Sequence, residues 1–215
     1  MPIAGARWNR LRYTLWTPIY DLVARRLERG RRVAHALAAI EAGERVLLDG
    51  AGTGLDLEML PEGVSVAAID ITPSMINRLR ERAVRQGIDV DARVANGQEL
   101  PFAAGSFDVV LLHLILAVIP DPVACIREAE RVLRPGGRVS IFDKFVRDGE
   151  RASAVRRAAN VITSLAATDI TRSLAPILEA TSLRVIRDEP AGFAGLFRAV
   201  VAEKQVERQV KGQRS

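Results

Sequence analysis

Val46-Leu-Leu-Asp-Gly-Ala-Gly-Thr-Gly-Leu-Asp56 is the stretch that decides the fold, because an apolar run ends there in a glycine-rich turn. A second apolar run, Val66-Ala-Ala-Ile-Asp70, ends in an acid about twenty residues after the first. This order predicts a strand, a loop whose backbone contacts a ligand, a helix, and a carboxylate for a ribose. A dinucleotide-binding loop has glycine three positions after its second glycine, where this chain has Leu55. The spacing Gly50-x-Gly52-x-Gly54 therefore predicts a different nucleotide.

Composition limits the class of protein. The chain has 215 residues, 48% of them hydrophobic and 27% charged, which predicts one globular domain with a full core. Cys125 is the single cysteine, so the chain has no internal disulfide, and we expect this residue to be buried on a helix. No uncharged apolar run reaches the roughly 18 residues of a membrane-spanning helix, and the N-terminus does not resemble a signal peptide. We therefore expect a cytoplasmic protein.

Charge is concentrated at the N-terminus. Residues 1–32 contain eight arginines, Asp21 and Glu28, a net of +6, whereas the whole chain carries +5, so residues 33–215 net about −1. Both tryptophans and both tyrosines lie within residues 1–20. A cationic, aromatic segment at 7–32 suits an anionic membrane surface, on the inner face of the membrane. The alternative is a lid helix whose aromatic side chains pack on the domain.

Apolar strands alternate with amphipathic helices after residue 43, which predicts a Rossmann-like, doubly wound sheet that is mostly parallel. Strands are expected at 45–49, 65–70, 90–95, 109–113, 138–143, 184–188 and 194–202. Helices are expected from 18 to a break at Gly30, then at 31–42, 55–60, 73–86, 122–133 and 151–180. Thr72 is expected to cap the helix at Pro73, and Arg134-Pro-Gly-Gly137 to close another. The connection at 189–192 is too short for a parallel crossover, so the seven-stranded sheet should end in an antiparallel hairpin.

Residues 42–143 resemble the class I S-adenosylmethionine-dependent methyltransferases. Three features carry the resemblance: the glycine loop, the stretch Ala95-Asn-Gly-Gln-Glu-Leu-Pro-Phe102, and the strand entry Ser106-Phe-Asp-Val-Val110. The resemblance implies S-adenosylmethionine as cofactor. It also implies three parts of the chain: a helical lid at 1–42, a cofactor-binding domain at 43–203 and a polar tail at 204–215.

The same resemblance assigns the cofactor contacts. Asp49 would bind the amino group, the three loop glycines the methionine moiety, and Asp70 both ribose hydroxyls. Asn96 stands where the family has an acid that reads the adenine amino group, and an amide oxygen still accepts that hydrogen bond. The remaining expected contacts are Ile71 and Met75 beside adenine, with Met75 equally suited to the core, and the backbone of Gly97 and Gln98.

The acceptor side is less specific. His113 ends a strand at the carboxyl edge, where open α/β sheets bind their ligands. It either contacts the cofactor or substrate or is a structural residue, and Leu114 is expected to line the same wall. The proton of the acceptor would pass to His113, Tyr20 or water, and Tyr20 would also cover the cofactor. The groups expected to hold a substrate phosphate or carboxylate are Lys144, Arg25 and Arg26, each of which is otherwise a surface charge. Residues 168–172 are a further candidate lining, and His35 is interpreted as incidental.

Acceptor chemistry therefore stays open between classes. Two histidines and one cysteine, far apart in sequence, predict no metal site. The N-terminal segment resembles that of bacterial phospholipid N-methyltransferases, which implies methylation of phosphatidylethanolamine toward phosphatidylcholine. Alternatives are a soluble methyltransferase of a small metabolite or quinone precursor, an RNA-binding methyltransferase, and a scaffold that only retains the cofactor. Nucleic acid is disfavoured because the basic charge is confined to one end.

Overall fold

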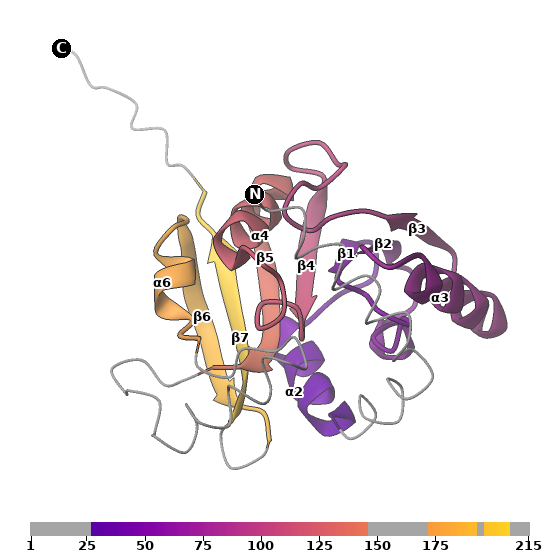
Figure 1. The fold of residues 1–215 in the computed structure, drawn as a ribbon, viewed down its shortest axis with the longest axis horizontal. Helices are drawn as coiled ribbons and strands as arrows, with labels where there is room; N and C mark the ends of the chain where they lie inside the picture. The colour runs from indigo at the N-terminus through magenta and orange to yellow at the C-terminus, as the bar shows by residue number, and fades with distance from the viewer. Residues whose placement is uncertain (1–26, 146–171, 193–195, 207–215) are drawn as a thin grey trace.

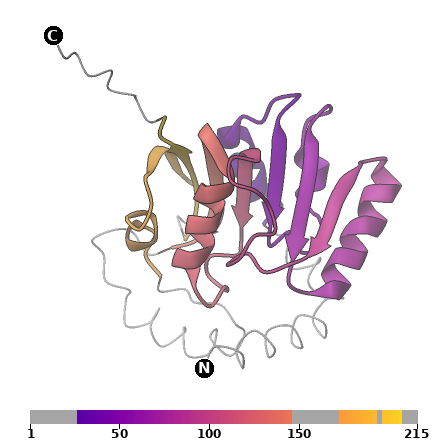
Figure 2. The same cartoon turned by 90° about the horizontal axis from the view of Figure 1, so that it is seen from above.

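A computed structural model describes residues 27–145, 172–192 and 196–206 of the 215. These residues form a seven-stranded sheet of order β3-β2-β1-β4-β5-β7-β6 (Figures 1 and 2). The strands are β1 (Arg45–Asp49), β2 (Ser65–Asp70), β3 (Val90–Val94), β4 (Phe107–His113), β5 (Leu133–Lys144), β6 (Leu183–Pro190) and β7 (Phe197–Lys204). β1 to β5 pair in parallel, and β7 is antiparallel to both β5 and β6. The expected parallel sheet with a terminal antiparallel hairpin is confirmed.

Helices cover both faces, which is why the central strands are apolar along their whole length. The helical elements are α2 (Glu28–Ala38), η1 (Leu57–Met59), α3 (Pro73–Gln86), α4 (Pro122–Val132) and α6 (Ala175–Leu178). Alternate strand residues point to opposite layers: Leu47 packs with Ile126 of α4, and Leu48 packs with Leu79 of α3. α2 packs against β5 and β7. Cys125 is fully buried on α4, as expected.

Several expected elements have different bounds. The helix expected at 55–60 is a single 3-10 turn, Leu57–Met59. Thr72 makes no capping bond, although Pro73 does begin α3. Gly30 does not break a helix but lies inside α2. A Cβ there would come within 2.5 Å of both the Ala191 carbonyl oxygen and the Phe142 ring, so Gly30 allows close packing of the helix on the sheet.

The end of α4 also differs from the expectation. α4 stops at Val132, and the next residues already belong to β5, which begins at Leu133 rather than at residue 138. Leu133 is extended at the cap position, and Gly136 takes the left-handed φ of 76° three residues later. Of the helix expected at 151–180, residues 151–171 lie outside the described part, and Ala175–Leu178 is a four-residue helix. Residues 18–26 of the helix expected from residue 18, and most of the tail, also lie outside the described residues.

Across the described ranges, no helix is both long enough and apolar enough to span a lipid bilayer.

Candidate functional site

The glycine loop after β1 has the backbone that its sequence predicts. The φ values of Gly50, Gly52 and Gly54 are 71°, 55° and 80°, a backbone region that residues with a side chain rarely adopt. A Cβ at Gly50 would also come within 2.5 Å of the Ile115 side chain. The loop therefore brings bare backbone to the carboxyl edge of the sheet.

Asp49, the last residue of β1, is a buried carboxylate with a free oxygen. It is 2% exposed, and its Oδ2 accepts a hydrogen bond from the Cys125 thiol at 3.5 Å. Its Oδ1 has no hydrogen-bond partner among the described residues. Burial, with weaker effects of Asp70 and Glu128, raises the pKa of Asp49 from 3.8 to about 7. Such an oxygen suits a cationic group that enters the site and supplies the missing partner.

Gly97 completes the surroundings of that oxygen. A Cβ at this position would lie 2.3 Å from Asp49 Oδ1, so any side chain would fill the space beside the carboxylate. The sequence interpretation gave Gly97 only a backbone contact, and its role in leaving this space open was missed. Asn96 Oδ1 accepts the Gln98 N–H at 3.1 Å, and Gln98 Oε1 accepts the Asp121 N–H at 2.8 Å. The backbone N–H and the side-chain oxygen of Gln98 are thus both engaged within the protein, while Asn96 Oδ1 keeps a second lone pair.

Asp70 joins the glycine loop to β2. Its Oδ2 accepts the Gly52 N–H at 3.0 Å and its Oδ1 accepts the Thr72 N–H at 2.8 Å. Burial raises the pKa of Asp70, and these hydrogen bonds oppose that shift. The Thr72 side chain makes a third hydrogen bond to the carboxylate, so the acceptor capacity that remains suits one ribose hydroxyl. Nearby, Ile71 is half-buried and Met75 is 2% exposed, as the core alternative for Met75 requires.

His113 lies at the carboxyl end of β4, but both of its ring nitrogens have protein partners. Nδ1 is 2.7 Å from Asp56 Oδ1, and Nε2 is 3.2 Å from the Ser140 hydroxyl. His113 is 6% exposed, and burial lowers its pKa. This geometry supports a structural role for His113 over a role as proton acceptor. The next residue, Leu114, has a left-handed φ of 62° and donates its N–H to the Phe142 oxygen at 2.7 Å.

The interpretation of His35 as incidental was wrong. Its Nε2 lies 2.9 Å from Asp56 Oδ1, and Arg31, one turn earlier on α2, places Nη1 2.8 Å from Asp56 Oδ2. Burial alone would raise the pKa of Asp56, but Arg31 and the two histidines hold that pKa well below its usual range. The spacing of Arg31 and His35 puts both on one helix face, which was the signal available in the sequence.

The same three groups have the spacing of metal ligands. The ligand atoms of His35, Asp56 and His113 all lie within 4.8 Å of one another, although the two histidines are far apart in sequence. The charge of Asp56 is already neutralised by Arg31, however, and a divalent ion would add uncompensated buried charge. We therefore assign the cluster a hydrogen-bonding role.

On the acceptor side, Lys144 lies at the same sheet edge as His113, as expected. Its Nζ is 3.9 Å from Asp143 Oδ1 and 5.8 Å from the centre of the Phe197 ring. Arg172 donates to the oxygens of Leu116, at 2.5 Å, and Ile119, at 2.9 Å, in the loop after β4. The expected site residues Tyr20, Arg25, Arg26 and 168–171 lie outside the described part.

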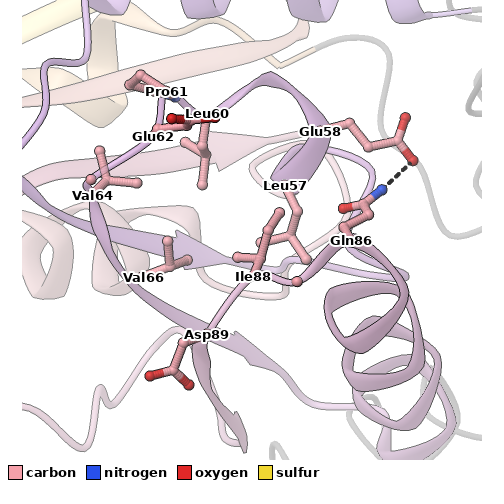
Figure 3. Close-up of a pocket in the computed structure, with 12 residues that line it drawn as sticks. Leu57, Glu58, Leu60, Pro61, Glu62, Val64, Val66, Gln86, Ile88 and Asp89 are labelled. Carbon is pink, nitrogen blue, oxygen red and sulfur yellow. Dashed lines mark hydrogen bonds between the residues drawn. The ribbon is translucent and has the colours of Figure 1, made fainter.

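A separate cavity of about 650 Å³ opens beside the start of β2 (Figure 3). Glu58 accepts a hydrogen bond from Gln86 at 3.0 Å across its rim. The cavity is lined by the apolar side chains of Leu57, Leu60, Val64, Val66 and Ile88, with Glu62 and Asp89 as further acids. β2 enters the sheet here and reaches Asp70 at its other end, so this cavity is distinct from the site at the carboxyl edge.

Known proteins resemble the chain over this site and beyond it. The family model described as a methyltransferase domain matches residues 47–141. A phosphatidylethanolamine N-methyltransferase from Cereibacter sphaeroides is 30% identical over 187 residues, 86% of this chain and 92% of that protein. A ubiquinone biosynthesis O-methyltransferase from Xanthomonas axonopodis pv. citri is 39% identical over 111 residues, 50% of this chain and 46% of that protein.

Solved structures share the fold at low sequence identity. One belongs to the complex of the Haloferax volcanii Trm112 methyltransferase activator with a methyltransferase, with a TM-score of 0.76 at 18% identity over 93% of this chain and 99% of that chain. Another is geranyl diphosphate C-methyltransferase from Streptomyces coelicolor A3(2), with a TM-score of 0.67 at 18% identity over 85% and 82% of the two chains. With a relative that matches along nearly its whole length, the chain belongs to the S-adenosylmethionine-dependent methyltransferases.

Proposed function

We propose that the protein N-methylates the amine of a phospholipid headgroup, phosphatidylethanolamine toward phosphatidylcholine, at an anionic membrane surface. The similarity to a phosphatidylethanolamine N-methyltransferase across 92% of that protein carries the proposal. The net charge of +6 in residues 1–32, with four aromatic side chains, supports docking to anionic lipid.

In this proposal the carboxyl edge of the sheet holds the cofactor. S-adenosylmethionine supplies an electrophilic methyl group when bound. Asp49 Oδ1 accepts the amino group, since this oxygen is buried and without a partner among the described residues, and Gly97 leaves the space for it. The loop glycines contact the methionine moiety, Asp70 accepts a hydrogen bond from a ribose hydroxyl, and Asn96 accepts one from the adenine amino group.

Methyl transfer is an in-line displacement that requires an aligned, unprotonated amine. We assign Lys144, with Arg25, to the headgroup phosphate, because Lys144 lies at the carboxyl edge of β5. Because both nitrogens of His113 are engaged by Asp56 and Ser140, the amine proton passes to Tyr20 or to water. Little further chemistry is needed beyond alignment and exclusion of water.

The direct test is transfer of label from methyl-labelled S-adenosylmethionine to vesicles that contain phosphatidylethanolamine, with and without anionic lipid. Labelled lipid that forms only with anionic lipid present is the expected result. If the protein binds the vesicles but labels no lipid, phosphatidylethanolamine is removed as the acceptor.

Docking has its own test. Substitution of Arg7, Arg10 and Arg12 by Glu should abolish vesicle binding and leave cofactor affinity unchanged, because the cofactor contacts proposed above all belong to residues 49–97. A matched control changes the same total charge on the described surface, at the exposed residues Arg85, Arg184 and Arg187. Equal vesicle binding by the two triple variants would contradict the docking role of the N-terminus.

The second candidate is a soluble methyltransferase of a quinone precursor or another small metabolite. The 39% identity to a ubiquinone biosynthesis O-methyltransferase favours it, although that match covers only 46% of the relative. It predicts normal activity on a water-soluble acceptor and no binding to vesicles. Activity of the Arg7, Arg10 and Arg12 variant on that acceptor would separate it from the lipid proposal.

A further inference from the structure

The glycine loop is held at several points along its length. At its start, Ala51 donates its N–H to the Ile69 oxygen at 2.9 Å. In the middle, the buried guanidinium of Arg82 on α3 donates to the Thr53 oxygen at 2.9 Å. At its end, Asp56 receives Arg31 and His35 from α2 and His113 from β4. Three elements distant in sequence therefore meet at one carboxylate.

The end of the loop needs this side-chain anchor because no long helix follows it. η1 contains only Leu57–Met59, and a 3-10 turn has poorer hydrogen-bond geometry than an α-helix. Among the described residues, the backbone at the end of the loop makes only local turn bonds, from the Leu57 N–H to the Gly54 oxygen and from the Met59 N–H to the Asp56 oxygen, each at 3.1 Å. Without the Asp56 side-chain contacts, this end of the loop would have no bond to a distant part of the fold.

We propose that Asp56 is a positioning residue for the cofactor: clamped by Arg31, His35 and His113, it holds the glycine loop in its binding form and joins that loop to α2. Asp56 is separated from Gly54 by one residue, so a shift of its carboxylate moves the backbone that lies against the methionine moiety. A loop that must be ordered on binding loses affinity, since the ligand then supplies the ordering free energy.

Proton positions follow from the charges in the cluster. Asp56 is ionised beside Arg31, so His35 Nε2 and His113 Nδ1 both donate to its Oδ1. His113 Nε2 is then an acceptor, and the Ser140 hydroxyl at 3.2 Å is its donor. The tautomer of His113 is thus defined by its two partners, and removal of any donor leaves the Asp56 carboxylate short of a partner.

The test compares two substitutions of His35. His35→Leu removes the donor to Asp56 with similar bulk, and His35→Gln retains an N–H near the position of Nε2. We expect His35→Leu to raise the dissociation constant for S-adenosylhomocysteine about tenfold, by calorimetry, and to speed amide exchange at residues 52–56. His35→Gln should restore most of the affinity. The exposed pair Arg32–Glu28 on the same helix supplies a control, Arg32→Gln, which should change neither.

A merely structural role would lower the melting temperature of His35→Leu and leave cofactor affinity and loop exchange unchanged, and this result would overturn the proposal. If His35→Leu does not fold, Ser140→Ala removes the hydroxyl that lies 3.2 Å from His113 Nε2 and 3.5 Å from the Ala34 oxygen, and it is measured in the same two ways, with unchanged affinity again overturning the proposal. No acceptor is present in these measurements, so their outcome is independent of the lipid proposal.

Discussion

Asp49 and Asp56 stand at the two ends of one glycine loop, both buried, and their surroundings are opposite. Asp49 has a thiol on one oxygen and no partner among the described residues on the other. Asp56 has a guanidinium and two imidazoles within 2.9 Å. The pKa of Asp49 is raised by burial to about 7, whereas Arg31 and the histidines hold the pKa of Asp56 well below its usual range.

From this difference we infer that the Asp49 carboxylate binds the cofactor and that the Asp56 carboxylate stabilises the fold. A buried group left without a partner costs stability, and a protein retains it where a ligand completes the site. A buried group with every partner in place contributes to a defined local structure. The two substitutions Asp49→Asn and Asp56→Asn should therefore change stability in opposite directions.

Asp56→Asn should have the largest effect on stability. It leaves the guanidinium of Arg31 buried without its counter-charge, which costs about 3–5 kcal/mol in comparable buried pairs. Urea unfolding of the cofactor-free protein measures this loss. A change in the free energy of unfolding within about 0.5 kcal/mol would show that the contacts of Asp56 add nothing to stability. The assignment of Asp56 to the fold would then be wrong.

Asp49→Asn should weaken cofactor binding while leaving the free protein as stable or more stable. Loss of a buried charge pair with the cofactor amino group costs about 2–5 kcal/mol, roughly a 30-fold or greater rise in the dissociation constant. At pH 8 the ionised carboxylate is buried at a cost, so its removal should stabilise the free protein by about 1–3 kcal/mol. Calorimetric titration and urea unfolding give the two values. A destabilised variant with unchanged affinity would contradict both halves of the assignment.

Cofactor affinity should fall as pH falls below about 7. The pKa of Asp49 is about 7 in the free protein, so the carboxyl is protonated below that pH and must release its proton to accept an ammonium group. Linkage then lowers the affinity about tenfold per pH unit below the pKa and leaves it flat above. Titrations in buffers of different ionisation enthalpy report the released proton. Asp49→Asn should remove this dependence, and its persistence would assign the proton to another group.

Sequence was informative where the determinants are local. The glycine spacing, Asp49, Asp70 and the alternation of strands and helices are each read from short segments, and the fold follows from them. The cluster around Asp56 was not readable because Arg31, His35 and His113 come together only when α2 packs on the sheet. Gly30 shows the same limit: helix-breaking propensity predicted a boundary, but contact with Phe142 and Ala191 placed it inside α2. Gly97 lies in the loop after β3, where the sequence placed it, but the space that it leaves beside Asp49 depends on β1 and this loop meeting in the fold.

Cys125 should give the smallest effect and the finest test of the Asp49 environment. Its thiol is the hydrogen-bond donor to Asp49 Oδ2 and opposes the rise in the pKa of that carboxyl, while burial raises the pKa of the thiol itself well above its usual value. Cys125→Ala removes the donor, so the pKa of Asp49 should rise further. The midpoint of the affinity–pH curve should then move upward, with less than about a threefold loss of affinity at pH 8, under 1 kcal/mol. Cys125→Ser keeps a donor and should hold the midpoint at or below that of the natural protein. If both variants shift the midpoint equally, packing around Asp49 rather than the thiol hydrogen bond sets the pKa of this carboxyl. The hydrogen bond from α4 would then have no part in preparing Asp49 for its ligand.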